Sequence, residues 1–182
     1  MDAAQEHAQE TIHHHGGTSR RVAVLIAALA AALALADMGE QQQQNQYLTH
    51  HISLSDHWGF YQAKNARAAI SDVEASILTN QPNAGEPGPQ AAIARAKANA
   101  ARLRDEPGGD GMKQIMERAA AEQEARDHAF HRYHEFEVVV GALQIAIVLA
   151  SVAVVTAVPA LAVAAGIIGA AAAAFGIFVA VA

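Results

Sequence analysis

The last 45 residues, Val138–Ala182, read VVVGALQIAIVLASVAVVTAVPALAVAAGIIGAAAAAFGIFVAVA and contain no Asp, Glu, Lys, Arg or His. Pro159 divides this run into segments 138–158 and 160–182, each about 20 residues and therefore about 30 Å of helix, one hydrocarbon thickness. Proline lacks a backbone donor and disfavours helix in the preceding residue, so the run predicts two antiparallel transmembrane helices joined by a short turn. The alternative is a buried hairpin in a soluble helical core, which the few remaining polar residues would cover poorly.

Small residues recur every four positions in both segments, which lets helix backbones approach closely in lipid. Gln144 and Ser151 share one face of the first segment and predict an interhelical hydrogen bond of roughly 1 kcal/mol; a pathway lined by Gln144 is the alternative. The absence of ionisable groups argues against a proton relay or ion-coupled transport. The small-residue stripes are Ala142, Ala146 and Ala150 in the first segment, and Ala162, Gly166 and Ala170 or Ala165, Gly169 and Ala173 in the second.

Residues 1–19 are polar and include the run His13-His14-His15, which predicts a disordered, histidine-containing tail; weak metal binding by that run is the other hypothesis. Arg20-Arg21 then precedes the apolar run Val22–Ala36. We predict a transmembrane helix over residues 20–38, with the N-terminus in the cytoplasm by the positive-inside rule. A cleaved signal peptide, suggested by the small-x-small ending Ala34-Leu35-Ala36, and a soluble helix are the alternatives.

Residues 39–137 are the expected extramembrane module. From Asp37 to Glu137 there are 10 Lys and Arg against 15 Asp and Glu, and the lack of a basic patch argues against nucleic acid as a partner. The chain has no cysteine, which excludes disulfides and thiolate metal sites.

Proline and glycine punctuate the module, with a loop at 79–89 and a second break at 107–111. Helices are expected over 40–78 and 90–104 and from residue 112 towards 137, and their order favours an antiparallel bundle with coiled-coil-like packing. Apolar positions are few and rich in alanine, so we expect self-association to bury more surface. The predicted seam of the first of these helices consists of Ala63, Ala66, Ile70, Val73 and Ile77.

Glu124, His128, His131 and Glu135 fall at i, i+4, i+7 and i+11, which places two imidazoles and two carboxylates on one helical face. Zinc, manganese and iron take such ligands, so the stripe is a candidate metal site. Helix-stabilising Glu and His pairs near a membrane surface are the alternative. No phosphate-binding glycine loop, nucleophile elbow or HExxH pattern is present, and we expect neither a catalytic residue nor a cofactor.

Ser55–Lys64 (SDHWGFYQAK) and His131–Glu137 (HRYHEFE), which leads into Leu143–Ser151 (LQIAIVLAS), resemble segments of the bacterial membrane proteins of "domain of unknown function 4337". The resemblance covers most of residues 20–178. It implies an integral membrane protein with a retained N-terminal span, a helical middle and a C-terminal hairpin, and it implies no activity. The positions that match the family's motifs are Asp56, Trp58, Tyr61, Gln62, Lys64, Gln144 and Ser151.

The sequence therefore predicts an all-α, multi-pass protein of the bacterial inner (cytoplasmic) membrane. It would have one N-terminal transmembrane helix, a coiled-coil-like middle bundle and a C-terminal transmembrane hairpin. The expected role is structural or scaffolding rather than enzymatic, with the lipid bilayer and further copies of the chain as partners, and it leaves room for an unidentified membrane protein partner. The alternative is a metal-binding or ion-handling membrane homo-oligomer that uses the His and Glu stripe.

Overall fold

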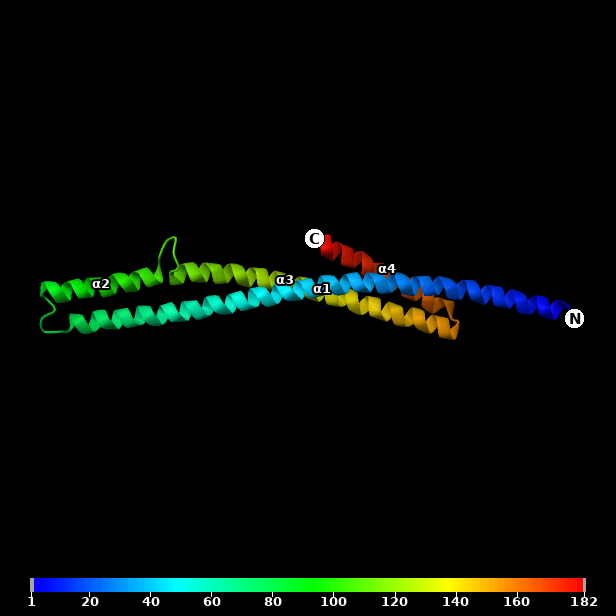
Figure 1. The fold of residues 1–182 in the computed structure, drawn as a ribbon, viewed down its shortest axis with the longest axis horizontal. Coiled ribbons are helices and arrows are strands. Elements are labelled where there is room, and N and C mark those ends of the chain that lie inside the picture. The colour runs from blue at the N-terminus through cyan, green and yellow to red at the C-terminus, as the bar shows by residue number, and fades with distance from the viewer. Residues whose placement is uncertain (1, 182) are drawn as a thin grey trace. The chain divides into compact units, whose positions relative to one another are not determined.

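The computed structural model describes the backbone of residues 2–181 and the side chains of residues 20–181. Within that range the chain forms four α-helices and no strand (Figure 1): α1 (Asp2–Thr79), α2 (Pro87–Arg104), α3 (Met112–Thr156) and α4 (Pro159–Val181). The predicted all-α class is confirmed. The chain folds as two compact units, which we call the apolar unit (residues 1–45 and 129–182) and the polar unit (residues 46–128).

Helix α1 differs from the predicted elements at both ends of the first apolar run. It begins at Asp2, whereas the sequence predicts a disordered tail over residues 1–19; the side chains of that segment lie outside the described residues, and its histidines stay untested. The helix also continues from 20–38 into the next predicted helix without a break. Gly39 is the one helix-weakening residue at this junction, and a single glycine costs a helix only about 1 kcal/mol.

The turn between α3 and α4 lies where proline predicts it. Helix α3 ends at Thr156, Ala157 has a φ of 53°, and Pro159 opens α4. A residue with left-handed φ just past a helix end is a common way to stop a helix, and proline suits a first helical position because its missing N–H has no helical partner there. The hairpin turn at the predicted site is therefore confirmed.

The core of the apolar unit joins α1, α3 and α4 through small side chains. Leu29 of α1, Ala146 of α3 and Gly169 of α4 meet at one point, where a Cβ on Gly169 would overlap the Leu29 side chain and lie 3.6 Å from the Ala146 Cβ. The predicted stripe on α3 is buried at Ala146 and Ala150. On α4 the buried stripe follows Ala165 and Gly169 but then passes to Ala172, Gly176 and Val179 instead of the predicted Ala173.

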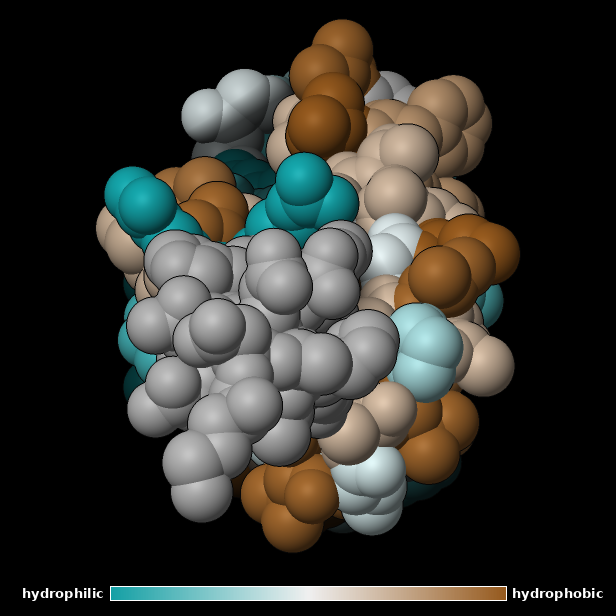
Figure 2. Space-filling model, turned by 90° about the vertical axis from the view of Figure 1, so that its right-hand side faces the viewer, coloured by the Kyte–Doolittle hydropathy of each residue, from teal (hydrophilic) through white to brown (hydrophobic). Residues whose placement is uncertain are grey.

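Three helices of the described chain are long and apolar enough to cross a membrane: α1 over Arg20–Thr79, α3 and α4. Many of their largest side chains point outwards, and Figure 2 shows such hydrophobic groups in brown on the outer surface. Val155 is 85% exposed, and Ile167 and Phe178 are each 66% exposed. Water solvates such a surface poorly, whereas lipid tails accommodate it, so the exposed surface is of the kind expected in a membrane.

In the polar unit, α2 and the first part of α3 follow one another along α1 (Figure 1). Asn99 donates to the buried Ser71 hydroxyl at 2.9 Å, Arg104 pairs with Asp72, and further along His50 lies 2.7 Å from Glu122. From Ser71 and Asp72 back to His50 along α1, the partners advance from α2 to Glu122 on α3. The unit is thus an antiparallel hairpin whose second arm is interrupted, and the prediction of a three-helix bundle was wrong.

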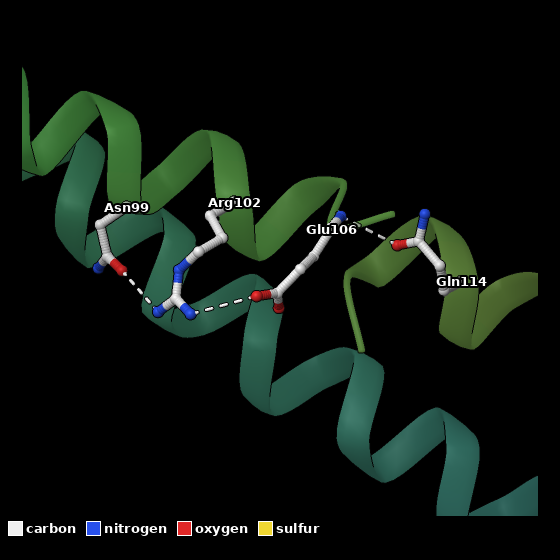
Figure 3. Close-up of polar contacts among 4 residues, drawn as sticks. All are labelled: Asn99, Arg102, Glu106 and Gln114. Carbon is white, nitrogen blue, oxygen red and sulfur yellow. Dashed lines mark hydrogen bonds and ion pairs between the residues drawn. The ribbon is translucent and has the colours of Figure 1, made fainter. Parts of the chain in front are cut away.

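Polar contacts hold the interruption between α2 and α3 (Figure 3). The Glu106 backbone N–H donates to Gln114 Oε1 at 3.1 Å, while the Glu106 carboxylate accepts from Arg102 at 3.3 Å. Gly108 has a φ of +77°, and a Cβ on Gly111 would overlap both Gln114 and the backbone of the turn. Because the turn is fixed at both ends, α3 resumes the direction of α2 instead of folding back.

The face of α1 that packs in the polar unit is not the predicted seam. The buried positions on α1 are Leu54, Ala68, Ser71 and Ala75, and the buried positions on α2 are Ala96, Ala100 and Leu103. The predicted seam is exposed throughout: Ala63, Ala66, Ile70, Val73 and Ile77. Small side chains at the buried positions let the two helices approach closely, whereas the larger apolar residues lie on the opposite side of α1.

Candidate interaction surface

An exposed apolar face runs along α1 through the polar unit. Ile70 is 67% exposed, Ile52 is 61% exposed, and Val73 and Ile77 are exposed to 57 and 58%. At 100° per residue these side chains fall within a narrow sector, diametrically opposite the buried sector that contains Ala68 and Ala75. We call this face the α1 stripe; its members are Leu48, Ile52, Ala63, Ala66, Ile70, Val73 and Ile77.

Charged residues border one side of the α1 stripe. Arg67 and Glu74 are both exposed, carry opposite charges and lie two turns apart on the same flank. In helix pairs, such flanking charges help to determine which partner is accepted. The α1 stripe thus has the apolar centre and charged edge of a helix-pairing surface.

The family-motif residues on α1 lie on several faces of the helix. Asp56 and Gln62 are exposed, and Trp58 is 43% exposed with its ring set edge-on to Tyr61 at 5.6 Å. Tyr61 and Lys64 are half-buried on the side that packs against the second arm. Tyr61 also borders an open cavity of about 550 Å³ beside the α2–α3 interruption, which Met112 and Met116 line as well. The motif therefore contributes to packing of the hairpin at this point.

The two motif residues on α3 do not form the predicted interhelical bond. Ser151 is exposed, and its hydroxyl donates to the Ile147 carbonyl of its own helix at 2.8 Å. Gln144 is also exposed. A serine in a helix can always reach the carbonyl four residues earlier, and this local bond takes the place of a partner on another helix.

The structure gives the predicted metal stripe no support. Glu124, His128, His131 and Glu135 are all exposed on α3. Over the part of the chain whose side chains are described, no group of three or more His, Asp or Glu residues lies close enough to hold a metal ion. The metal-binding hypothesis stays a prediction from residue spacing alone.

A different pair, which the sequence analysis missed, joins the two arms of the polar unit. His50 Nδ1 lies 2.7 Å from Glu122 Oε2, and both side chains are about one-third exposed, at 34 and 29%. The hydrogen bond from His50 lowers the pKa of Glu122, against the smaller opposing effect of burial, and Ser53 and His57 add to the lowering. The two partners are 72 residues apart, so no local spacing in the sequence could have revealed the pair.

Comparison with known proteins places the chain in a family. No curated protein and no solved structure matches it. A family model described as "Domain of unknown function (DUF4337)" matches residues 18–182, which include all the motif positions named above. That range takes in α2, α3 and α4 whole and most of α1, and it agrees with the resemblance noted in the sequence. The chain therefore belongs to the DUF4337 family, whose function is unknown.

Proposed function

We propose that the chain is a multi-pass protein of the bacterial inner membrane whose polar unit self-associates, with a structural or scaffolding role instead of an enzymatic one. Its N-terminus would lie in the cytoplasm, because Arg20-Arg21 borders the first apolar run. The apolar outer surfaces of α3 and α4 support insertion into a bilayer.

The observation that carries self-association is the α1 stripe. Burying one Val or Ile side chain contributes about 1.5–3 kcal/mol of free energy. Covering several such residues on one face would therefore favour association strongly. The hairpin's own interface is built largely from alanines such as Ala68, Ala75, Ala96 and Ala100, which bury little apolar surface. The α1 stripe lies outside the apolar run and exposes its largest side chains to water. Such an exposed apolar surface favours association with a partner that covers it.

A second copy of the chain is the occupant that the stripe fits best. Every copy presents the same apolar face, and symmetric homo-oligomers use one patch on both subunits. Arg67 and Glu74 supply both signs of charge on the flank, so two copies can match without placing only like charges together. No other segment among the described residues carries a comparable exposed stripe with helical spacing in the polar unit.

The test uses the absence of native cysteine. Ile70→Cys introduces the only thiol of the chain on the α1 stripe, and a symmetric contact between two stripes places the two thiols together when the helices run parallel and in register. We expect mild oxidation of Ile70→Cys in native membranes to yield a disulfide-linked dimer in high yield.

Asn65→Cys is the matched control, because Asn65 is exposed on the same helix but lies away from the stripe. It should cross-link poorly under the same conditions. Equal yields for the two variants would show random collision and would sink the proposed contact. A chain that stays monomeric by size measurement in mild detergent, with no cross-link at position 70, would count against self-association as a whole.

A further inference from the structure

A cavity of about 560 Å³ lies in the apolar unit between α1, α3 and α4. Its wall is mostly apolar and includes Leu35, Phe136, Leu143 and Ile177, whereas Gln42, Gln43 and Arg132 supply its polar groups. This volume is within the range of pockets that hold small organic ligands, about 300–1,000 Å³.

The cavity is long and has a polar end. Gly39 packs on Phe136 and Leu29 packs near Ala146, so α1 and α3 run antiparallel and Gln43 lies level with Arg132. The lining on α1 extends from Ala32 to Gln43, which is about 16 Å of helix. Its deep part lies beside the uncharged segments, and its polar part lies just beyond them, at the level expected for lipid headgroups.

Arg132 is incompletely paired at this polar end. One of its terminal nitrogens donates to the Val179 carbonyl near the end of α4, a favourable place for a cation. Its Nε is buried and has no hydrogen-bond partner. A guanidinium has five N–H donors in a fork that suits phosphate, and a buried donor left without a partner is costly.

Among the described residues, no Asp or Glu side chain lines the cavity. The nearby acids Asp37, Glu40 and Glu137 project from other faces of α1 and α3, since at 100° per residue none of them falls in the cavity-lining sector of its helix. The lining thus combines one cation, two amides and an apolar wall. A free anion would interact only with the Arg132 guanidinium, and a hydrocarbon would contact only the apolar wall.

We propose that this cavity binds an anionic phospholipid, with its phosphate on Arg132 and an acyl chain along the apolar wall between α1 and α4. The proposal rests on the membrane insertion in the proposed function and does not depend on self-association. Gln42 and Gln43 would donate to the glycerol or headgroup oxygens. The bound lipid would stabilise the packing of α4 against α1 and α3 by occupying the space between them.

The test is native mass spectrometry of the full-length protein, stripped of lipid in mild detergent and titrated with phosphatidylglycerol, phosphatidylcholine or inorganic phosphate. We expect one phosphatidylglycerol per chain, bound in preference to phosphatidylcholine, and no retention of inorganic phosphate. Arg132→Gln should weaken phosphatidylglycerol binding about tenfold, as expected for loss of one charged hydrogen-bonding group. Arg95→Gln, which changes an exposed arginine of the polar unit outside the lining, should leave it unchanged.

Two further variants separate binding from folding. Arg132→Lys keeps the charge but lacks the Nε donor and should bind with intermediate affinity, whereas Ala173→Leu keeps Arg132 and narrows the cavity from α4 and should also lose the lipid. Equal phosphatidylglycerol occupancy in wild type and Arg132→Gln would overturn the proposal, as would retention of inorganic phosphate as strong as that of the lipid. Failure of membrane insertion would be seen separately, as release of the protein from membranes by alkaline carbonate.

Discussion

Gly39 of α1 lies directly against the ring of Phe136 on α3: a Cβ added at Gly39 would be 2.6 Å from the ring Cε1 and 2.8 Å from Cζ. Phe136 is buried and lines the cavity described above, so an added Cβ would push its ring out of its packed position. We expect Gly39→Ala to destabilise the apolar unit by about 1–3 kcal/mol, because overpacking outweighs the gain of up to about 1 kcal/mol in helix propensity. Thermal unfolding in detergent, followed by circular dichroism, measures the effect.

Gly141→Ala is the control for this substitution, since no heavy atom lies within 4 Å of a Cβ added at Gly141. It should leave the melting temperature unchanged or raise it slightly. Combining Gly39→Ala with Phe136→Leu should recover part of the loss, because the smaller side chain makes room. A neutral effect of Gly39→Ala alone would mean that α1 and α3 do not pack at this point.

Gly169 is the second close contact in the apolar unit, where α4 crosses the side chain of Leu29 on α1. We expect Gly169→Val to separate α4 from α1 and to destabilise the unit by about 1–3 kcal/mol. Gly166→Val, one turn earlier on α4, meets nothing within 4 Å and should be tolerated. Resistance to unfolding by SDS compares the two variants; equal resistance would contradict the packing of α4 on α1.

The sequence predicts the three breaks between the helices because local chemistry determines them, although it misses the start of α1 and its continuation past residue 38. Pro159 lies in the α3–α4 turn and opens α4, Pro87 opens α2 three residues before its predicted start, and the left-handed Gly108 lies in the second break. Each residue acts through its own backbone, so its effect does not depend on the rest of the fold. The apolar character of α3 and α4 is equally local, since it follows from composition over one helix length.

Choice of face and distant pairing could not be predicted in the same way. Helix α1 has two faces with the same 3-4 spacing, one large and apolar around Ile70 and one small around Ala68, and periodicity cannot tell which one packs on α2. The partners His50 and Glu122 are 72 residues apart. The predicted ligand His128 shares a face with His131 on α3, but a metal site needs ligands from a second element, which only the fold can supply.

The His50–Glu122 pair makes the stability of the polar unit depend on pH. Because the folded state lowers the pKa of Glu122, its contribution is fully present above the carboxyl's ordinary pKa of about 4.3 and is lost as the pH falls through the lower folded value. We expect acid unfolding of the polar unit to begin below about pH 4, and Glu122→Gln to flatten this dependence. Helicity by circular dichroism at each pH measures it, with the exposed neighbour Glu124→Gln as control. If Glu122→Gln lost helicity at the same acidic pH as the wild type, the His50–Glu122 pair would be excluded as the cause of the acid unfolding.

The two faces of α1 should respond oppositely to substitution. Ala68 is 1% exposed against α2, so Ala68→Leu should overpack the hairpin and destabilise it by about 1–3 kcal/mol. Ile70→Ala removes a side chain that is 67% exposed, and it should leave thermal stability at high dilution nearly unchanged while weakening self-association. Thermal unfolding and size measurement over a concentration series separate the two effects. If Ile70→Ala were more destabilising than Ala68→Leu at high dilution, the α1 stripe would be the face that packs within a single chain. The face around Ala68 would then not be the packed one.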